Sequence, residues 1–265
     1  MIKDITIGQY IPGESFIHKL DPRTKILITF LFIISLFIVD KFVGYIFVVA
    51  FLALVVYVAK ISPRYLYKGL KPVFLLIALT AILNIFMLRE GRLLFQLGFI
   101  KIYESGIKTA LFMAIRLILL IMGTSVLTLT TSPIELTDGI ERLLRPIGKE
   151  IAHELAMMMT IALRFIPTLI DETDKIMKAQ KARGADFESG GLVKKAKNLI
   201  PLLVPLFISS FRRADELAMA MEARCYRGGA GRTRMKVLKF TSKDFIAFGV
   251  FALLLTSTLI VRFAM

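Results

Sequence analysis

The sequence predicts an all-α integral membrane protein with about five transmembrane helices and a further domain of long amphipathic helices. Of its 265 residues, 56% are hydrophobic and 21% are charged, which is too apolar for an ordinary soluble domain. The formal net charge is +15, and basic charge beside long apolar runs is typical of the cytoplasmic loops of a multi-span membrane protein. We therefore expect the bilayer, and no nucleic acid, to be the partner of this basic charge.

Five apolar runs account for the predicted spans. They cover residues 26–39, 42–59, 73–88, 110–129 and 245–263. The first run is short for a bilayer core of about 30 Å, but lysines at both of its ends can snorkel to the interface. The segment 93–100 is too short to cross, so we expect it at the interface or in a loop. No removable signal peptide is expected, because no small-residue cleavage site follows the first run.

These runs divide the chain into a membrane domain (1–130), a polar segment (131–242) and a C-terminal transmembrane helix (243–265). Five spans with the polar segment in the cytoplasm place the N-terminus inside and the C-terminus outside. The loop at residues 60–71 carries four basic residues and then faces the cytoplasm, as the positive-inside rule requires. The loop at 89–108 opposes the rule, with four basic and two acidic residues on the predicted outside.

The polar segment is too charged to cross a membrane and too apolar to be a solvated tail, so we expect interfacial helices. Ser132 is suited to cap a first helix that starts at Pro133. A second helix is predicted over about 150–182, with apolar residues at helical spacing on one side. A third covers about 192–224, with Pro201 and Pro205 as interruptions.

The two long helices end alike. Asp174 to Gly184 and Asp215 to Cys225 align without a gap and share an Asp, two Ala and an Arg at equivalent places. Arg183 and Arg224 therefore stand at the two helix ends. Each could simply complement the negative end of the helix dipole, which contributes about 0.3 to 1 kcal/mol. Alternatively, the pair could present planar guanidinium groups to acidic grooves on partner proteins.

The two helix ends also resemble a known family. Lys181 to Phe187 and Glu222 to Gly228 are similar to the paired signature motifs of the transmembrane T component (EcfT/CbiQ type) of energy-coupling factor transporters, which are ATP-binding cassette (ABC) transporters. Other stretches of the chain are similar to the same family, namely 18–25, 130–133, 141–146 and 163–167. One departure is Cys225, where the family usually has Gly. Because Gly takes the left-handed conformation at little cost and Cys does not, we expect a different cap there.

The resemblance implies a non-catalytic coupling subunit of an importer for vitamins or related micronutrients in a prokaryotic cell membrane. The N-terminus and the coupling domain would lie in the cytoplasm. Its implied partners are two ABC-type ATPases and a small membrane protein that captures the substrate. The implied ATPase-docking residues are Ala182, Arg183, Gly184, Ala223, Arg224 and Cys225. The absence of a G-x-x-x-x-G-K-S/T loop agrees, because the chain should then not hydrolyse ATP itself.

A set of methionines has two interpretations. Flexible thioether side chains suit a surface that repacks against changing partners, here the substrate-capture protein, but they also pack ordinary cores. The set comprises Met157, Met158, Met159, Met219 and Met221.

Two other classes of protein remain as alternatives. A membrane enzyme acting on a lipid-linked phosphate would need a nucleophile or base converging with metal ligands or Arg, and His153 has no such company in the sequence. A self-contained secondary carrier would show broken helices or inverted repeats, whereas only the polar segment repeats. One cysteine and two histidines form no recognisable zinc pattern, so no metal or cofactor is expected. Arg116 lies inside the fourth span and should face protein, water or the interface.

Overall fold

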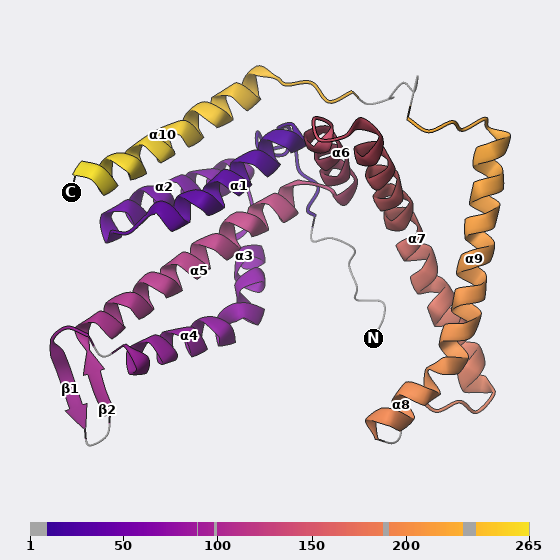
Figure 1. Cartoon of the computed structure of the whole chain (residues 1–265), viewed down its shortest axis with the longest axis horizontal. Helices are drawn as coiled ribbons and strands as arrows, with labels where there is room; N and C mark the ends of the chain where they lie inside the picture. Colours follow the sequence, from indigo (N-terminus) through magenta and orange to yellow (C-terminus); the bar gives the residue numbers. More distant parts are fainter. Residues whose placement is uncertain (1–9, 89, 98–99, 188–190, 230–236, 265) are drawn as a thin grey trace. The chain divides into compact units, whose positions relative to one another are not determined.

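The computed structural model describes residues 10–88, 90–97, 100–187, 191–229 and 237–264, and it is almost entirely helical (Figure 1). The helices are α1 Pro22–Ile38, α2 Phe42–Ala59, α3 Pro63–Leu70, the short 3-10 turn η2 Lys71–Val73, α4 Phe74–Met87, α5 Glu104–Thr130, α6 Pro133–Leu144, α7 Lys149–Ala182, α8 Leu192–Asn198, α9 Ile200–Ala223 and α10 Ser242–Ala264. The two strands are β1 Leu93–Leu97 and β2 Ile100–Tyr103. The predicted all-α membrane fold is thereby confirmed.

Five helical segments are long and apolar enough to cross a membrane. They are Phe42–Ala59, Pro63–Met87, Glu104–Thr130, Lys149–Ala182 and Ser242–Phe263. The set differs from the predicted runs in two members. Helix α1 has 17 residues, about 26 Å, and is therefore shorter than a bilayer core. Helix α7 is long and apolar enough to cross a membrane, whereas its sequence predicts an interfacial helix.

The described residues form two compact units. The bundle unit contains the described residues of 8–139 and 237–265, and the helix-pair unit contains those of 140–236. Helix α6 begins in the first unit and ends in the second. Each unit has its own internal packing.

In the bundle unit, α1, α2, α5 and α10 pack around a common core. Leu36, Val48, Leu129 and Phe251, one from each helix, are almost completely buried in it. Helix α4 lies beside α5 (Figure 1), where Gly106 permits close approach, since a Cβ there would lie 3.0 Å from the carbonyl oxygen of Ile85. The outer faces of these helices expose many large apolar side chains, as expected for surfaces that face lipid or another membrane protein.

The segment between α4 and α5 is a β-hairpin. Strands β1 and β2 pair antiparallel, with Leu93 opposite Tyr103 and Leu97 opposite Ile100. The sequence predicts an interfacial or loop segment at 93–100, of which the structure describes 93–97 and 100 as strand. Its length excludes a span, but its apolar content does not by itself distinguish a strand from a buried loop.

Helices α6, α7 and α8 begin at Pro133, Lys149 and Leu192, within one residue of the predicted starts. The Ser132 side chain accepts a hydrogen bond from the backbone N–H of Glu135 (3.3 Å), so the predicted cap of α6 is confirmed. The third predicted helix is divided into α8 and α9. Pro201 lies in the first turn of α9, a position that tolerates proline, and Pro205 lies inside the helix.

Candidate functional site

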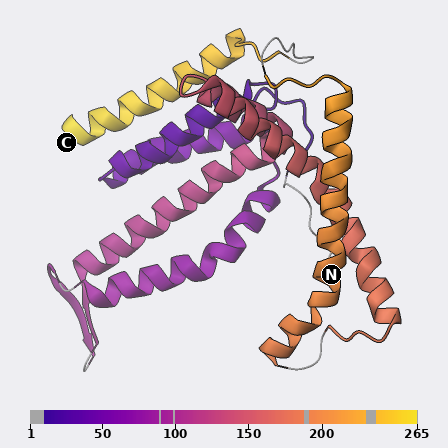
Figure 2. The same ribbon diagram turned by 45° about the vertical axis from the view of Figure 1, so that its right-hand side comes forward.

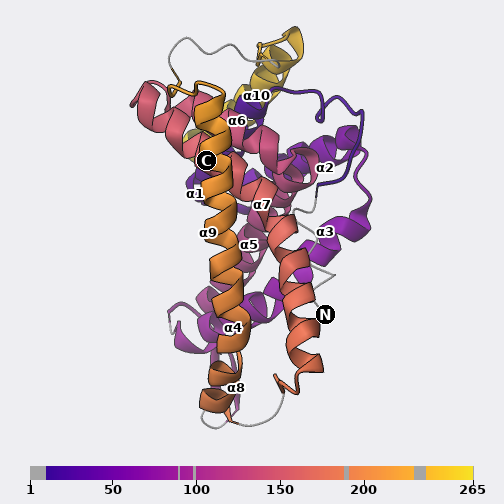
Figure 3. The same cartoon turned by 90° about the vertical axis from the view of Figure 1, so that its right-hand side faces the viewer.

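Helices α7 and α9 pack together and run in opposite directions (Figures 2 and 3). An ion pair joins them midway, with 3.1 Å between Arg213 Nη2 and Glu172 Oε2. At the end of α9, Arg224 lines the same pocket as Ile161 of α7. Roughly 22 residues of α7, at about 1.5 Å each, separate Ile161 from Arg183, which places the two arginines roughly 33 Å apart.

The end of α7 is closed by a Schellman motif. The N–H of Gly184 donates to the carbonyl of Lys181 (3.0 Å), and that of Ala185 donates to the carbonyl of Gln180 (3.0 Å). Gly184 has a φ of +86°, in the left-handed region that glycine adopts without a steric penalty. Arg183 is therefore the last residue before the backbone takes the left-handed conformation at Gly184.

The end of α9 has the same motif. The N–H of Cys225 donates to the carbonyl of Glu222 (2.8 Å), and that of Tyr226 donates to the carbonyl of Met221 (3.0 Å). Cys225 has a φ of +54°. The different cap expected at this position is therefore absent: the hydrogen bonds are the same, and Cys225 adopts the left-handed conformation in place of glycine.

Both arginines are exposed on these capped ends. Neither the Arg183 nor the Arg224 guanidinium forms a hydrogen bond or ion pair within the part of the chain that the structure describes. The flanking residues Ala182, Gly184, Ala223 and Cys225 are also exposed. Each end thus presents a defined backbone turn, small neighbouring side chains and an exposed guanidinium group without a partner among the described residues.

The two ends differ in their surroundings. A pocket of about 590 Å³ lies beside Arg224, and it is also lined by Arg164 and Arg227. At the other end, the side-chain amide of Asn198 donates to the Asp186 carbonyl (2.6 Å), so α8 supports the turn after Arg183. The Arg224 end therefore concentrates more positive charge.

The five methionines fall into two groups. Met157 and Met221 line the pocket beside Arg224, and Met159 is half-buried. Met158 and Met219 are more than half exposed. The structure therefore places part of the set next to one arginine and leaves part of it on the open surface.

A cluster around His153 contacts the chain just after the second arginine and was not found from the sequence. His153 Nδ1 lies 3.5 Å from a carboxylate oxygen of Glu141, and His153 Nε2 lies 3.5 Å from the Tyr226 hydroxyl. A Cβ on Gly229 would lie 2.6 Å from the His153 ring, so the chain after Tyr226 passes closely over it. Tyr226, the aromatic residue directly after Cys225, was the signal available in the sequence.

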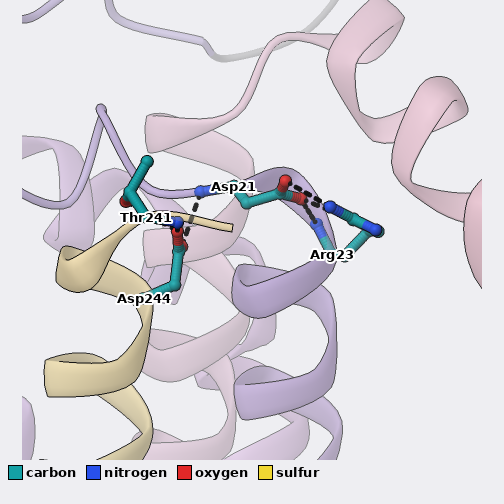
Figure 4. A network of polar contacts seen from close by, with 4 residues as sticks. All are labelled: Asp21, Arg23, Thr241 and Asp244. Carbon is teal, nitrogen blue, oxygen red and sulfur yellow. Dashed lines mark hydrogen bonds and ion pairs between the residues drawn. The ribbon is translucent and has the colours of Figure 1, made fainter. Parts of the chain in front are cut away.

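In the bundle unit, a polar network ties the start of α10 to the start of α1 (Figure 4). Asp244 Oδ1 accepts from the Asp21 backbone N–H (2.9 Å), and Asp244 Oδ2 accepts from the Thr241 backbone N–H (2.7 Å) and hydroxyl (2.8 Å). Asp21 in turn accepts from the Arg23 guanidinium, which stacks over Phe240 at 4.0 Å. The stretch 18–25, which carried part of the family resemblance, thus anchors the last helix.

Lys25 performs a similar role between α1 and α5. Its buried ammonium group donates to the carbonyls of His18 (3.1 Å) and Thr130 (2.9 Å). His18 Nε2 lies 3.1 Å from the Ile11 carbonyl, and Nδ1 lies 2.6 Å from the Ser15 hydroxyl. Burial lowers the pKa of His18 below its ordinary value. Among the described residues, no group of three or more His, Cys, Asp or Glu side chains could hold a metal ion.

Comparison with known proteins identifies the family of this chain. The family model for CbiQ, described as a cobalt transport protein, matches residues 13–237. The chain belongs to this family of membrane transport components. It is 68% identical to the energy-coupling factor transporter transmembrane protein EcfT of Clostridium kluyveri over 93% of both chains, and 59% identical to that of Thermosediminibacter oceani over 99% of both. Identity to the Bacillus subtilis EcfT is 50%, over 92% of this chain and 93% of the relative.

Proposed function

We propose that this transmembrane component is the coupling subunit of an ATP-driven importer for vitamins or related micronutrients. In this proposal, two ABC-type ATPase subunits hydrolyse ATP and dock on the ends of α7 and α9. A separate small membrane protein captures the substrate, and this chain transmits the movement without itself being an enzyme. Residues 131–242 form the coupling domain on the cytoplasmic side of a prokaryotic cell membrane.

The observation that carries the proposal is the repeated helix end. Arg183 and Arg224 follow the same backbone turn, are exposed and have no partner in the described residues. The turn itself is a common helix end, and what favours docking is that the same Ala-Arg pair, exposed on both helices, precedes it twice. Two such ends, roughly 33 Å apart by the helical rise, suit two separate docking proteins.

The substrate-capture protein has a different candidate surface. Met158 and Met219 are exposed, Met157 and Met221 line the pocket beside Arg224, and Met159 is half-buried. Unbranched thioether side chains can repack as a partner slides across them. We assign the exposed pair to this contact.

Substitution of the two arginines tests the docking role. Loss of a partly buried charged contact costs on the order of 2 to 5 kcal/mol, so the Arg183→Ala/Arg224→Ala protein should bind the ATPases at least about tenfold more weakly. Co-purification from the native membrane and coupled uptake should both fall. Arg212→Ala, an exposed arginine on the same α9 helix, is the matched control and should retain both.

Membrane insertion of the double variant must be intact for this comparison to count. If the double variant retains the ATPases fully and supports normal uptake, the docking role is refuted and both arginines are only helix-end cations. Purification also separates the alternatives, because a membrane enzyme or a self-contained carrier does not require two ATPases and a small apolar protein in the eluate. The chain purified alone should show no nucleotide hydrolysis and no tight vitamin binding.

A further inference from the structure

A second basic pocket lies in the bundle unit, between the α1–α2 turn and the first half of α5. Its volume is about 560 Å³, and it is lined by Lys41, Lys108 and Arg116 together with apolar side chains. The lining carboxylate, Asp40, is engaged by Arg262 from α10, with 3.4 Å between Arg262 Nη2 and Asp40 Oδ2. The pocket therefore has an excess of positive charge.

Arg116 contributes a cation whose hydrogen bonds go to neutral acceptors. Its Nε donates to the Tyr45 hydroxyl (3.1 Å) and its Nη2 donates to the Val39 carbonyl (3.1 Å), and both acceptors are neutral. No carboxylate pairs with it in the described part of the chain, although it lies within a helix long and apolar enough to cross a membrane. A guanidinium has five donors, so an anion in the pocket could accept from those that remain.

The two lysines differ in their pairing. Lys41 is half-buried and forms no ion pair with any described residue. Lys108 Nζ lies 2.5 Å from Glu104, but both side chains are well exposed, so this pair is screened by solvent. The positive charges of the two lysines and Arg116 are therefore available to a strongly charged anionic ligand.

The position of the pocket indicates where the anion comes from. Lys25 and Thr130 join α1 to α5 at one end, and Val39 and Arg116 join the same helices about 21 Å further along by helical rise. If α1 crosses the membrane as predicted, that interval is shorter than a hydrocarbon core of about 30 Å, and local thinning of the bilayer beside the α1–α2 turn would accommodate it. Thinning brings lipid headgroups to the level of the pocket.

The apolar wall also suits a lipid. The Phe112 ring meets those of Phe42 and Tyr45 edge to face, with centroids 4.7 and 4.9 Å apart. Phe42 and Met113 remain exposed beside the cations. A phospholipid would place its phosphate among the cations and its first methylenes against this wall.

We infer that the pocket binds the phosphate of an anionic phospholipid. The shared chemistry is a phosphate anion, and the thinned bilayer favours lipid over free phosphate as its source. A bound lipid would neutralise Arg116 and hold the α1–α2 turn against α5.

A single fluorophore can test this, because the chain contains no tryptophan. Phe42→Trp places a reporter in the pocket wall, and the full chain is reconstituted in phosphatidylcholine vesicles with a minor fraction of brominated phosphatidylglycerol. Quenching should exceed that given by the same fraction of brominated phosphatidylcholine. Adding Lys41→Gln and Lys108→Gln should lower this preference by about fivefold for each cation removed.

Lys68→Gln is the matched control, since Lys68 is an exposed lysine on α3 outside the pocket and should leave the preference unchanged. Equal quenching by the two lipids, or a preference that survives in the double lysine variant, would overturn the inference. Relief of quenching by millimolar inorganic phosphate, at constant ionic strength, would also overturn it by assigning the pocket to the free anion.

Discussion

The residue after each arginine determines how the guanidinium is presented. Gly184 and Cys225 both have a positive φ, and both donate the same Schellman hydrogen bond. For a residue with a Cβ, the left-handed conformation costs roughly 1 to 2 kcal/mol. The second helix end therefore holds a strained residue where the first holds a relaxed one.

Exchange of side chains at these two positions should shift stability in opposite directions. We expect Cys225→Gly to raise the free energy of unfolding by up to about 1 kcal/mol, because the gain in the turn exceeds the added entropy of the unfolded chain. Gly184→Ala should lower it, and no atom lies within 4 Å of the added Cβ, so only the backbone is tested. Thermal unfolding in detergent measures both changes, and an unaffected Gly184→Ala protein would contradict the argument.

His18 makes the stability of the bundle unit depend on pH. Its pKa is lowered chiefly by burial and further by the charge of Lys25, against opposite effects of the Ile11 carbonyl and Glu135. The unfolded chain therefore takes up the proton before the folded one does. Stability is complete above the ordinary pKa of 6.5 and is lost as the pH falls toward the lowered value.

Unfolding midpoints measured across this pH range should show the loss of stability. The loss should level off below the pKa that His18 has in the folded protein. In His18→Gln the corresponding slope should be smaller, since the group that titrates is gone. His153 remains in both proteins, so the difference between them isolates His18. An identical slope in the two proteins would exclude His18 as the cause.

At the scale of elements, polar groups near the start of α1 hold this helix in place. In the sequence, this region shows only basic residues that precede an apolar run. Asp21 is joined to Asp244 of α10, and Lys25 is joined to Thr130 of α5. These links connect helices that are far apart in the sequence. They make the first residues of α1 a meeting point for both later helices.

Replacement of Lys25 should therefore loosen the packing of α1 on α5. Lys25→Met keeps the apolar stem but leaves the buried Thr130 carbonyl without its donor, which costs about 1 to 3 kcal/mol. Lys19→Met is the control, because Lys19 pairs with Glu14 on the surface and such pairs contribute little. A thermal unfolding midpoint for Lys25→Met equal to that of the control would refute the structural role.

At the scale of the whole molecule, the topology stays a prediction. The five predicted spans include 26–39 and leave α7 in the cytoplasm, whereas length and composition alone select α7 and omit α1. The snorkelling lysines at the two ends of the first run favour crossing despite its length. The many charged residues of α7 favour the membrane surface.

Labelling of single cysteines from one side of the membrane resolves this. Cys225, the one native cysteine, is exposed and would first be changed to Gly. Cysteines at Gly91 or Arg92 should then react from outside, and one at Lys178 in α7 should react only after the cytoplasmic side is opened. Cytoplasmic labelling of residues 91 or 92 would overturn the five-span topology.

The sequence by itself determined the class of fold, the bounds of most helices, the cap at Ser132 and the arginine repeat. These depend on apolar runs, helical periodicity and turn residues, which are local in the chain. The β-hairpin, the division of α8 from α9 and the left-handed Cys225 were not predicted, because short apolar runs and backbone turns depend on context.

Only the tertiary structure decided which distant groups meet. It placed Arg183 and Arg224 at opposite ends of one helix pair, joined Asp244 to Asp21 and set Arg116 against Tyr45 and Val39. The partners in these last contacts are 71 to 223 residues apart in the chain. Packing of whole helix faces brings them together, and no single segment carries the information that specifies such a contact.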